Sequence, residues 1–135
     1  MQSTVRFMFE QNWPIDRIES YWRTFEQTIG RARAVLVYFT HPRPHEFVHR
    51  HTIPARGDAW PKIARYVEQT PAGRRLGAAG FDVPVEFWVR YRHMCDGLLD
   101  ETTLPVLPID TSNGWQGIPG GVTEWLDTLE SDCEE

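Results

Sequence analysis

The feature that most constrains the fold is a pair of short apolar segments that lie far apart in the sequence. Residues 34–39 (AVLVYF) form a continuous, partly β-branched run, which is typical of a strand covered on both faces. Residues 104–109 (LPVLPI) form a second strand, and its two prolines favour the edge of a sheet because they cannot donate to a ladder. Since a long stretch with helical patterns separates the two strands, we expect a parallel pair joined by a helical crossover.

Helical periodicity accounts for much of the remaining chain. Apolar residues spaced i, i+3, i+4 and i+7 predict a helix over residues 15–29, ended by Gly30, and a long helix over residues 84–99. Shorter helices are expected over residues 44–51, 58–69 (capped by Asp58) and 122–129, whereas residues 3–11 fit either a strand or a helix. Residues 70–73 (TPAG), with Gly77 and Gly80, suggest a flexible connector. The expected fold class is α/β, with two parallel strands and five or six helices.

Length and composition place residues 1–135 in a single domain of ordinary globular type. The chain is 41% hydrophobic and 24% charged, and no apolar run approaches the roughly 18 residues of a membrane helix. Cys95 and Cys133 are isolated cysteines without the spacing of a zinc or redox motif. We therefore expect a cytoplasmic protein without a membrane partner.

The net charge of −5 is unevenly distributed along the chain. The last twelve residues hold six of the 19 acidic residues and none of the 14 basic ones, so the end, from about residue 130, is an acidic tail. Between Arg43 and Arg75, seven basic residues stand against three acidic ones. This is too little positive charge for a broad nucleic-acid surface, which we do not expect, but it suits a small phosphate ligand.

The order and spacing of several segments carry a resemblance that runs along nearly the whole chain. They are residues 35–39 followed by Pro42, residues 56–60 (RGDAW), Gly80 and Phe81 before the long helix with Tyr91 and Asp96, and residues 107–110 leading to Asn113 and Trp115. Together they resemble the C-terminal half of the P-loop nucleoside and nucleotide kinases, the thymidylate-kinase-like and deoxynucleoside-kinase-like proteins. The resemblance implies a remnant of a doubly wound P-loop sheet, and a helix rather than a strand at residues 1–7.

The resemblance also implies a set of functional residues. Arg56 is similar to the lid arginine that closes over phosphates and stabilises the transferred phosphoryl group, and Arg50 would be a second phosphate contact. Asp110, Ser112 and Asn113 would form the loop beside the adenine base. In the intact family the cofactors are ATP and Mg²⁺. From the residues alone, Arg56 fits a solvated turn equally well, and the residues after Asp110 fit an Asx turn that caps the next helix.

The chain departs from the family in one decisive respect. The sequence contains no Gly-x-x-x-x-Gly-Lys-Ser/Thr motif, so no such loop cradles the β- and γ-phosphates. A truncated reading frame, a fragment and a genuine short descendant all fit this departure. We expect a nucleotide- or phosphate-associated protein that is inactive as a kinase in this form, with weak binding of a nucleotide or nucleoside and no tight binding of ATP or Mg²⁺.

Two further hypotheses come from different classes of protein. The first is a non-catalytic interaction module in which the open edge of residues 35–39 pairs with another chain, including a second copy. The second is a metal-binding protein that uses His41, His45 and His49, which are spaced i, i+4, i+8, with His51 nearby. Because no carboxylate or thiolate completes this set, we assign no metal site. Cys95 is expected to be a buried thiol.

Overall fold

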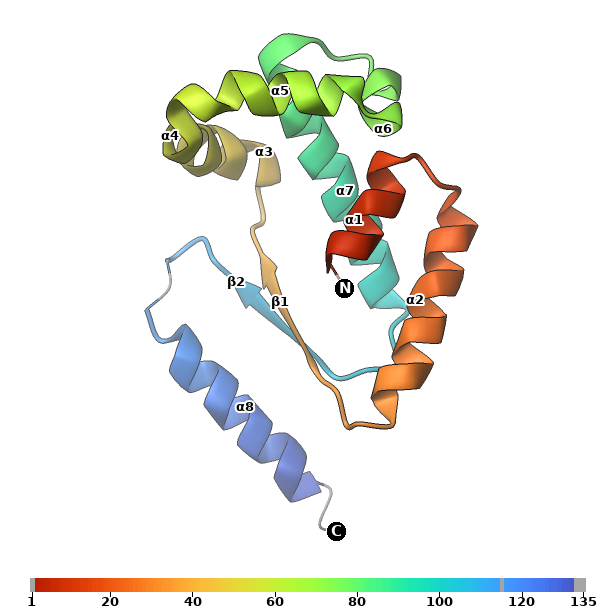
Figure 1. Cartoon of the computed structure of the whole chain (residues 1–135). Helices are drawn as coiled ribbons and strands as arrows, with labels where there is room; N and C mark the ends of the chain where they lie inside the picture. Colours follow the sequence, from red (N-terminus) through yellow and green to blue (C-terminus); the bar gives the residue numbers. More distant parts are fainter. Residues whose placement is uncertain (1, 115, 133–135) are drawn as a thin grey trace.

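The computed structural model of the chain describes residues 2–114 and 116–132, and most of its elements are helical (Figure 1). The elements follow the order α1 (Gln2–Glu10), α2 (Ile15–Gly30), β1 (Leu36–Thr40), α3 (Pro44–Phe47), a π-helical turn (Val48–Thr52), α4 (Ile53–Arg56), a 3₁₀ turn (Gly57–Ala59), α5 (Trp60–Gln69), α6 (Pro71–Arg75), a 3₁₀ turn (Gly80–Asp82), α7 (Val83–Asp100), β2 (Val106–Asp110) and α8 (Ile118–Asp132).

The two predicted strands are parallel neighbours, and the α/β class is confirmed at this level. β1 pairs with β2 in a register that sets Leu36 beside Val106 and Thr40 beside Asp110. Helical segments within the described residues outnumber the five or six expected, because short helices fill the crossover. No helix among these residues is long and apolar enough to cross a membrane.

We predicted that other parts of the chain cover residues 35–39 on both faces of the strand, and this prediction is wrong. No residue of β1 is fully buried, and Phe39 keeps 46% of its surface exposed. Such an apolar run is typical of a strand in the middle of a wide sheet, but within the described residues the sheet has only these two strands. α7 lies against one side of the pair, and α8 extends beside β2 on the side away from α2 (Figure 1).

The hydrophobic core lies between helices rather than under the sheet. Val5 and Met8 of α1, Ile18 and Trp22 of α2, and Phe87 of α7 are all buried in one cluster. A smaller cluster surrounds the fully buried Trp60. The helix that the resemblance implied at the start of the chain is confirmed, since α1 contributes the edge-on contact between the rings of Phe9 and Phe87, with centroids 5.1 Å apart.

Two local predictions around α5 and α6 are wrong. Residues 70–73 are not a flexible connector but the start of α6, because the hydroxyl of Thr70 accepts a hydrogen bond from the Gly73 N–H at 3.0 Å and Pro71 occupies the first turn. Asp58 does not cap α5. The helix begins at Trp60, no side chain caps it, and Asp58 lies within the preceding 3₁₀ turn.

The helix predicted over residues 44–51 continues to Arg56, but with one widened turn. The N–H of Ile53 bonds to the carbonyl of Val48, five residues back, which defines the π-helical turn. Pro54 explains this geometry: it has no N–H to give to the carbonyl of Arg50, and its ring would clash with that carbonyl in a regular α-helix.

Candidate functional site

A cavity of about 370 Å³ opens at the carboxyl ends of the two parallel strands. One wall is the end of β1 with His41, the second is α3 with the π-helical turn, and the third is the middle of α7. Thr111, directly after β2, closes the remaining side. This is the edge at which open parallel sheets bind their ligands. The cavity is therefore the candidate site.

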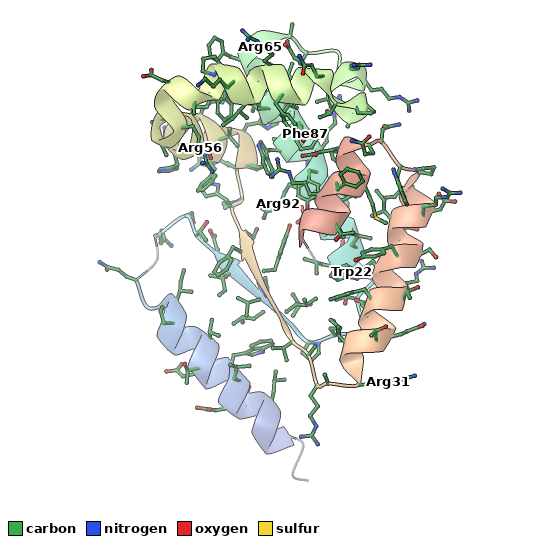
Figure 2. The ribbon with its side chains drawn as sticks, in the orientation of Figure 1. Trp22, Arg31, Arg56, Arg65, Phe87 and Arg92 are labelled. Carbon is green, nitrogen blue, oxygen red and sulfur yellow. The ribbon has the colours of Figure 1, made fainter. Side chains whose placement is uncertain are left out.

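Arg92 on α7 supplies the guanidinium group of this cavity. Its Nε donates to Oδ1 of Asp96 at 3.2 Å, and its Nη2 donates to the hydroxyl of Thr40 at the end of β1. The guanidinium carbon also lies 5.1 Å from the centre of the Tyr38 ring, a cation–π contact. Figure 2 shows Arg92 in the middle of the molecule, toward the space beside β1. The side chain is thus fixed from three directions.

The Tyr38 hydroxyl joins the same network. It donates to Oδ1 of Asp96 at 2.7 Å, so Tyr38 and Arg92 share one carboxylate oxygen. Burial, together with this hydrogen bond, raises the pKa of Tyr38 well above its usual value. The tyrosine therefore stays a neutral hydrogen-bond donor over the physiological pH range.

Apart from the imidazole of His41, the remaining side chains of the cavity are apolar or carry hydroxyl or thiol groups. Burial raises the pKa of the Cys95 thiol and of the Tyr91 hydroxyl. Cys95 is half-buried rather than fully buried as expected, and its raised pKa makes it a poor nucleophile. Phe39, Phe47 and Trp88 add aromatic surface to the walls. The arrangement can hold a flat, partly apolar molecule that carries a negative group, with Arg92 as the cation.

The ends of the two strands are tied together directly beside the cavity. The backbone N–H of Thr111 donates to the carbonyl of Thr40 at 2.8 Å, and the Thr111 hydroxyl donates to the same carbonyl at 3.0 Å. Since Thr40 also accepts from Arg92, one residue connects the sheet to α7 and to the loop after β2.

The two arginines predicted from the sequence do not line this cavity. Arg50 is exposed and its Nη1 bonds to Glu46 at 2.7 Å, which ties it along its own helix. Arg56 is exposed at the end of α4, before Gly57 with its positive φ of 46°. Figure 2 places Arg56 at the α3–α4 end of the molecule, apart from Arg92. The structure does not bring Arg50 or Arg56 to the candidate site.

The predicted adenine loop forms a tight turn at the rim. Oδ1 of Asp110 accepts from the Ser112 N–H at 2.8 Å, which is the Asx turn anticipated as the simpler explanation. Hydrogen bonds from Ser112 hold the pKa of Asp110 below its usual value. Ser112 and Asn113 are exposed and neither lines the cavity, whereas their neighbour Thr111 does. Trp115, which follows this loop and belongs to the resemblance, lies outside the described residues.

The histidines are distributed among separate contacts. Nε2 of His45 lies 3.1 Å from Oε1 of Glu86. The rings of His41 and His51 both contact the ring of Phe47, with centroids 5.0 and 5.2 Å from it. Among the described residues, no three histidine, cysteine or carboxylate side chains are grouped so that they could share a metal ion.

Sequence reasoning missed Arg92, Thr40 and Thr111. Arg92 lies in a helix whose neighbouring aromatic residues indicated only a core. The signal that points to it is the spacing of Arg92 and Asp96, an i, i+4 pair of opposite charges on a half-buried face. No family model matches the chain, and no curated protein or solved structure matches it either.

Proposed function

We propose that this protein binds a nucleotide or nucleoside in the cavity at the carboxyl ends of β1 and β2, and that it is a remnant of a doubly wound P-loop kinase-like sheet. The observation that carries the proposal is the position of the cavity: it lies where a parallel pair ends, and Arg92 faces it. The resemblance of the sequence to nucleoside and nucleotide kinases supports the same ligand class.

The walls suit a nucleoside in size and chemistry. Aromatic side chains such as Phe39 and Phe47 give the walls apolar surface against which a base can pack. The hydroxyl groups of Thr40, Thr52 and Thr111 offer hydrogen bonds to the base or the sugar. A cavity of about 370 Å³ lies in the range of small-molecule sites.

Binding is tested by titration calorimetry with nucleosides and nucleotides. Thr52→Phe should fill the cavity and abolish heat of binding, whereas Tyr66→Ala, at an exposed position on α5, should leave it unchanged. Retained binding in Thr52→Phe would show that the ligand binds elsewhere.

The lid role of Arg56 needs a separate variant. Arg56→Gln should weaken nucleotide binding if the arginine closes over the ligand, as the resemblance implies. Unchanged affinity would remove Arg56 from the site. Arg50→Gln tests the second predicted phosphate contact in the same way.

The proposed activity stops at binding. Positioning of the phosphates and of Mg²⁺ supplies most of the rate in phosphoryl transfer, and the sequence has no Walker-type loop to position them. We therefore expect no ATPase or nucleoside kinase turnover in a magnesium-dependent assay. Turnover that survives repurification and is lost in Thr52→Phe would place catalysis in this cavity.

One observation favours a second candidate function, an interaction module. Within the described residues β1 has a strand neighbour on one side only, and Phe39 is 46% exposed. Unpaired N–H and C=O groups beside exposed apolar side chains favour pairing with another chain. The partner that we propose is a second copy of this chain.

A further inference from the structure

We infer that Arg92 is the phosphate-binding residue of the cavity and that the ligand carries a single phosphate, as in a nucleoside monophosphate. The inference rests on the proposed function, which it narrows from nucleotides and nucleosides in general to one class. It also assigns the phosphate contact to Arg92 on α7, in place of Arg56 on α4 and Arg50 in the π-helical turn.

The contacts of Arg92 leave part of its hydrogen-bonding capacity for a ligand. A guanidinium group has five N–H donors in a planar fork. Asp96 takes the Nε donor and Thr40 takes one donor of Nη2. The other donors of the fork can bond to a ligand in the cavity that Arg92 lines. A phosphate oxygen pair is the group that matches such a fork.

The support around Arg92 is built before a ligand arrives. Asp96 receives hydrogen bonds from both Tyr38 and Arg92, and the Tyr38 ring lies against the guanidinium face. A side chain that is already fixed loses little conformational freedom on binding. Asp96 and Tyr38 are therefore positioning residues for the phosphate contact.

The balance of charge limits the ligand to one phosphate. Arg92 is the one lysine or arginine among the described residues that line the cavity, and the carboxylate of Asp96 beside it offsets part of its charge. Arg50 is paired with Glu46 and does not line the cavity. A triphosphate would bring several negative charges to a site in which Arg92 is the one permanent cation among the described lining residues, and charge without a partner is costly to take out of water.

Calorimetry with a matched series of ligands tests the inference. For one base at a time, the nucleoside, its 5′-monophosphate and its triphosphate are titrated at low salt into the wild-type chain and into Arg92→Gln. The monophosphate should bind about tenfold more tightly than the nucleoside to the wild type. Arg92→Gln should abolish the preference, so that this variant binds the monophosphate no more tightly than it binds the nucleoside.

A conservative variant guards against loss of the fold. Arg92→Lys keeps the charge but not the fork, so its preference for the monophosphate should lie between those of the wild type and Arg92→Gln. Alkylation of Cys95 in a Cys133→Ser chain reports occupancy of the cavity itself, because Cys95 lines it. The monophosphate should slow this alkylation in the wild type and not in Arg92→Gln.

The outcomes separate the inference from the proposed function. Equal affinities for nucleoside and monophosphate, or tighter binding of the triphosphate, would overturn the single-phosphate inference and leave nucleotide binding standing. An unchanged monophosphate preference in Arg92→Gln would remove Arg92 from the phosphate contact. No binding of any member of the series would overturn both.

Discussion

Gly73 is a residue at which the backbone of the fold leaves no room for a side chain. A Cβ atom added to it would lie 1.8 Å from the carbonyl oxygen of Val67, a backbone atom that cannot swing away. Its N–H also bonds to the hydroxyl of Thr70. The corner between α5 and α6 therefore depends on this glycine.

The matched pair Gly73→Ala and Gly97→Ala tests that dependence. We expect Gly73→Ala to destabilise the fold by about 3 kcal/mol or more, since the backbone must move. Gly97 lies exposed within α7, and a Cβ atom added there would meet nothing within 4 Å, so alanine should stabilise the helix by about 0.5–1 kcal/mol. Urea unfolding of both variants measures the difference, and equal free energies of unfolding would contradict it.

The raised pKa of Tyr38 predicts that the folded chain loses stability at alkaline pH. Its pKa is raised in the folded chain, so above its unfolded value of about 10 the native state binds more protons than the unfolded state. The free energy of unfolding should therefore fall as pH rises through that region. Cys95, whose pKa is also raised, should start the decline near its unfolded value of about 8.5.

The measurement is urea unfolding at a series of pH values between about 8 and 11. Tyr38→Phe should lower stability at neutral pH, because it removes the hydrogen bond to Asp96, and should flatten the decline above pH 10. A decline of unchanged steepness in Tyr38→Phe would assign the alkaline loss to other groups.

The candidate site could be predicted from the sequence only in its location. The residues expected beside the adenine base, Asp110, Ser112 and Asn113, lie at the same edge of the sheet as the cavity, but only their neighbour Thr111 lines it. Arg92 was not predicted, because its importance comes from Thr40 and Tyr38, which lie far away in the chain and meet it only after folding. Arg56 and Arg50 were named from the resemblance to the kinases, which does not show where the helical segment that carries them lies relative to the cavity.

At the scale of elements, β1 combines a core-like sequence with an exposed position. We expect the chain to self-associate at micromolar concentration through the side of this strand that faces away from β2, as judged by sedimentation velocity. Phe39→Lys should weaken association while costing little stability, because Phe39 is 46% exposed. Since Phe39 also lines the cavity, association is measured without added ligand. Leu36→Lys should weaken association as well, but with a larger loss of stability, since Leu36 packs against the main core.

Ile15→Lys is the control for added charge alone. Ile15 is 52% exposed on α2, and its substitution should leave association unchanged. A wild-type chain that stays monomeric over this concentration range would contradict the prediction, and so would equal effects of Phe39→Lys and Ile15→Lys.

Helices were predictable from the sequence where the apolar periodicity extends over many residues. α2 and α7 match the helices expected from periodicity within a few residues, and both strands are present and parallel. The errors lie where one proline or threonine changes the backbone locally. Pro54 widened a predicted helix into a π-helical turn, and Thr70 with Pro71 began a helix where a connector was expected.

At the scale of the whole molecule, the buried residues and the sheet occupy different parts. The main core belongs to α1, α2 and α7, with α5 and α6 at its edge, whereas β1 and β2 contain no fully buried residue. Regions with few buried apolar contacts open at lower free energy than the core. The two parts should therefore differ in stability.

Hydrogen exchange followed by mass spectrometry measures this difference. Amides of β1 and β2 should exchange markedly faster than those in the middle of α7, and Trp22→Ala in the core should raise exchange in α1, α2 and α7 together. Exchange of the strands and of α7 at one common rate would show that the chain opens as a single unit.

The residues that line the cavity come from segments 38–52 and 88–95 and from residue 111, so a molecule bound there touches both the sheet and the helical part. While it is bound, such a ligand holds together segments that are distant in the chain. At a free concentration one hundred times its dissociation constant it would add about 2.7 kcal/mol to the stability of the state that binds it. The weaker part of the molecule gains most from this link, since opening of the sheet requires the ligand to leave. Occupancy of the cavity thus decides whether the strands unfold ahead of the helices or together with them.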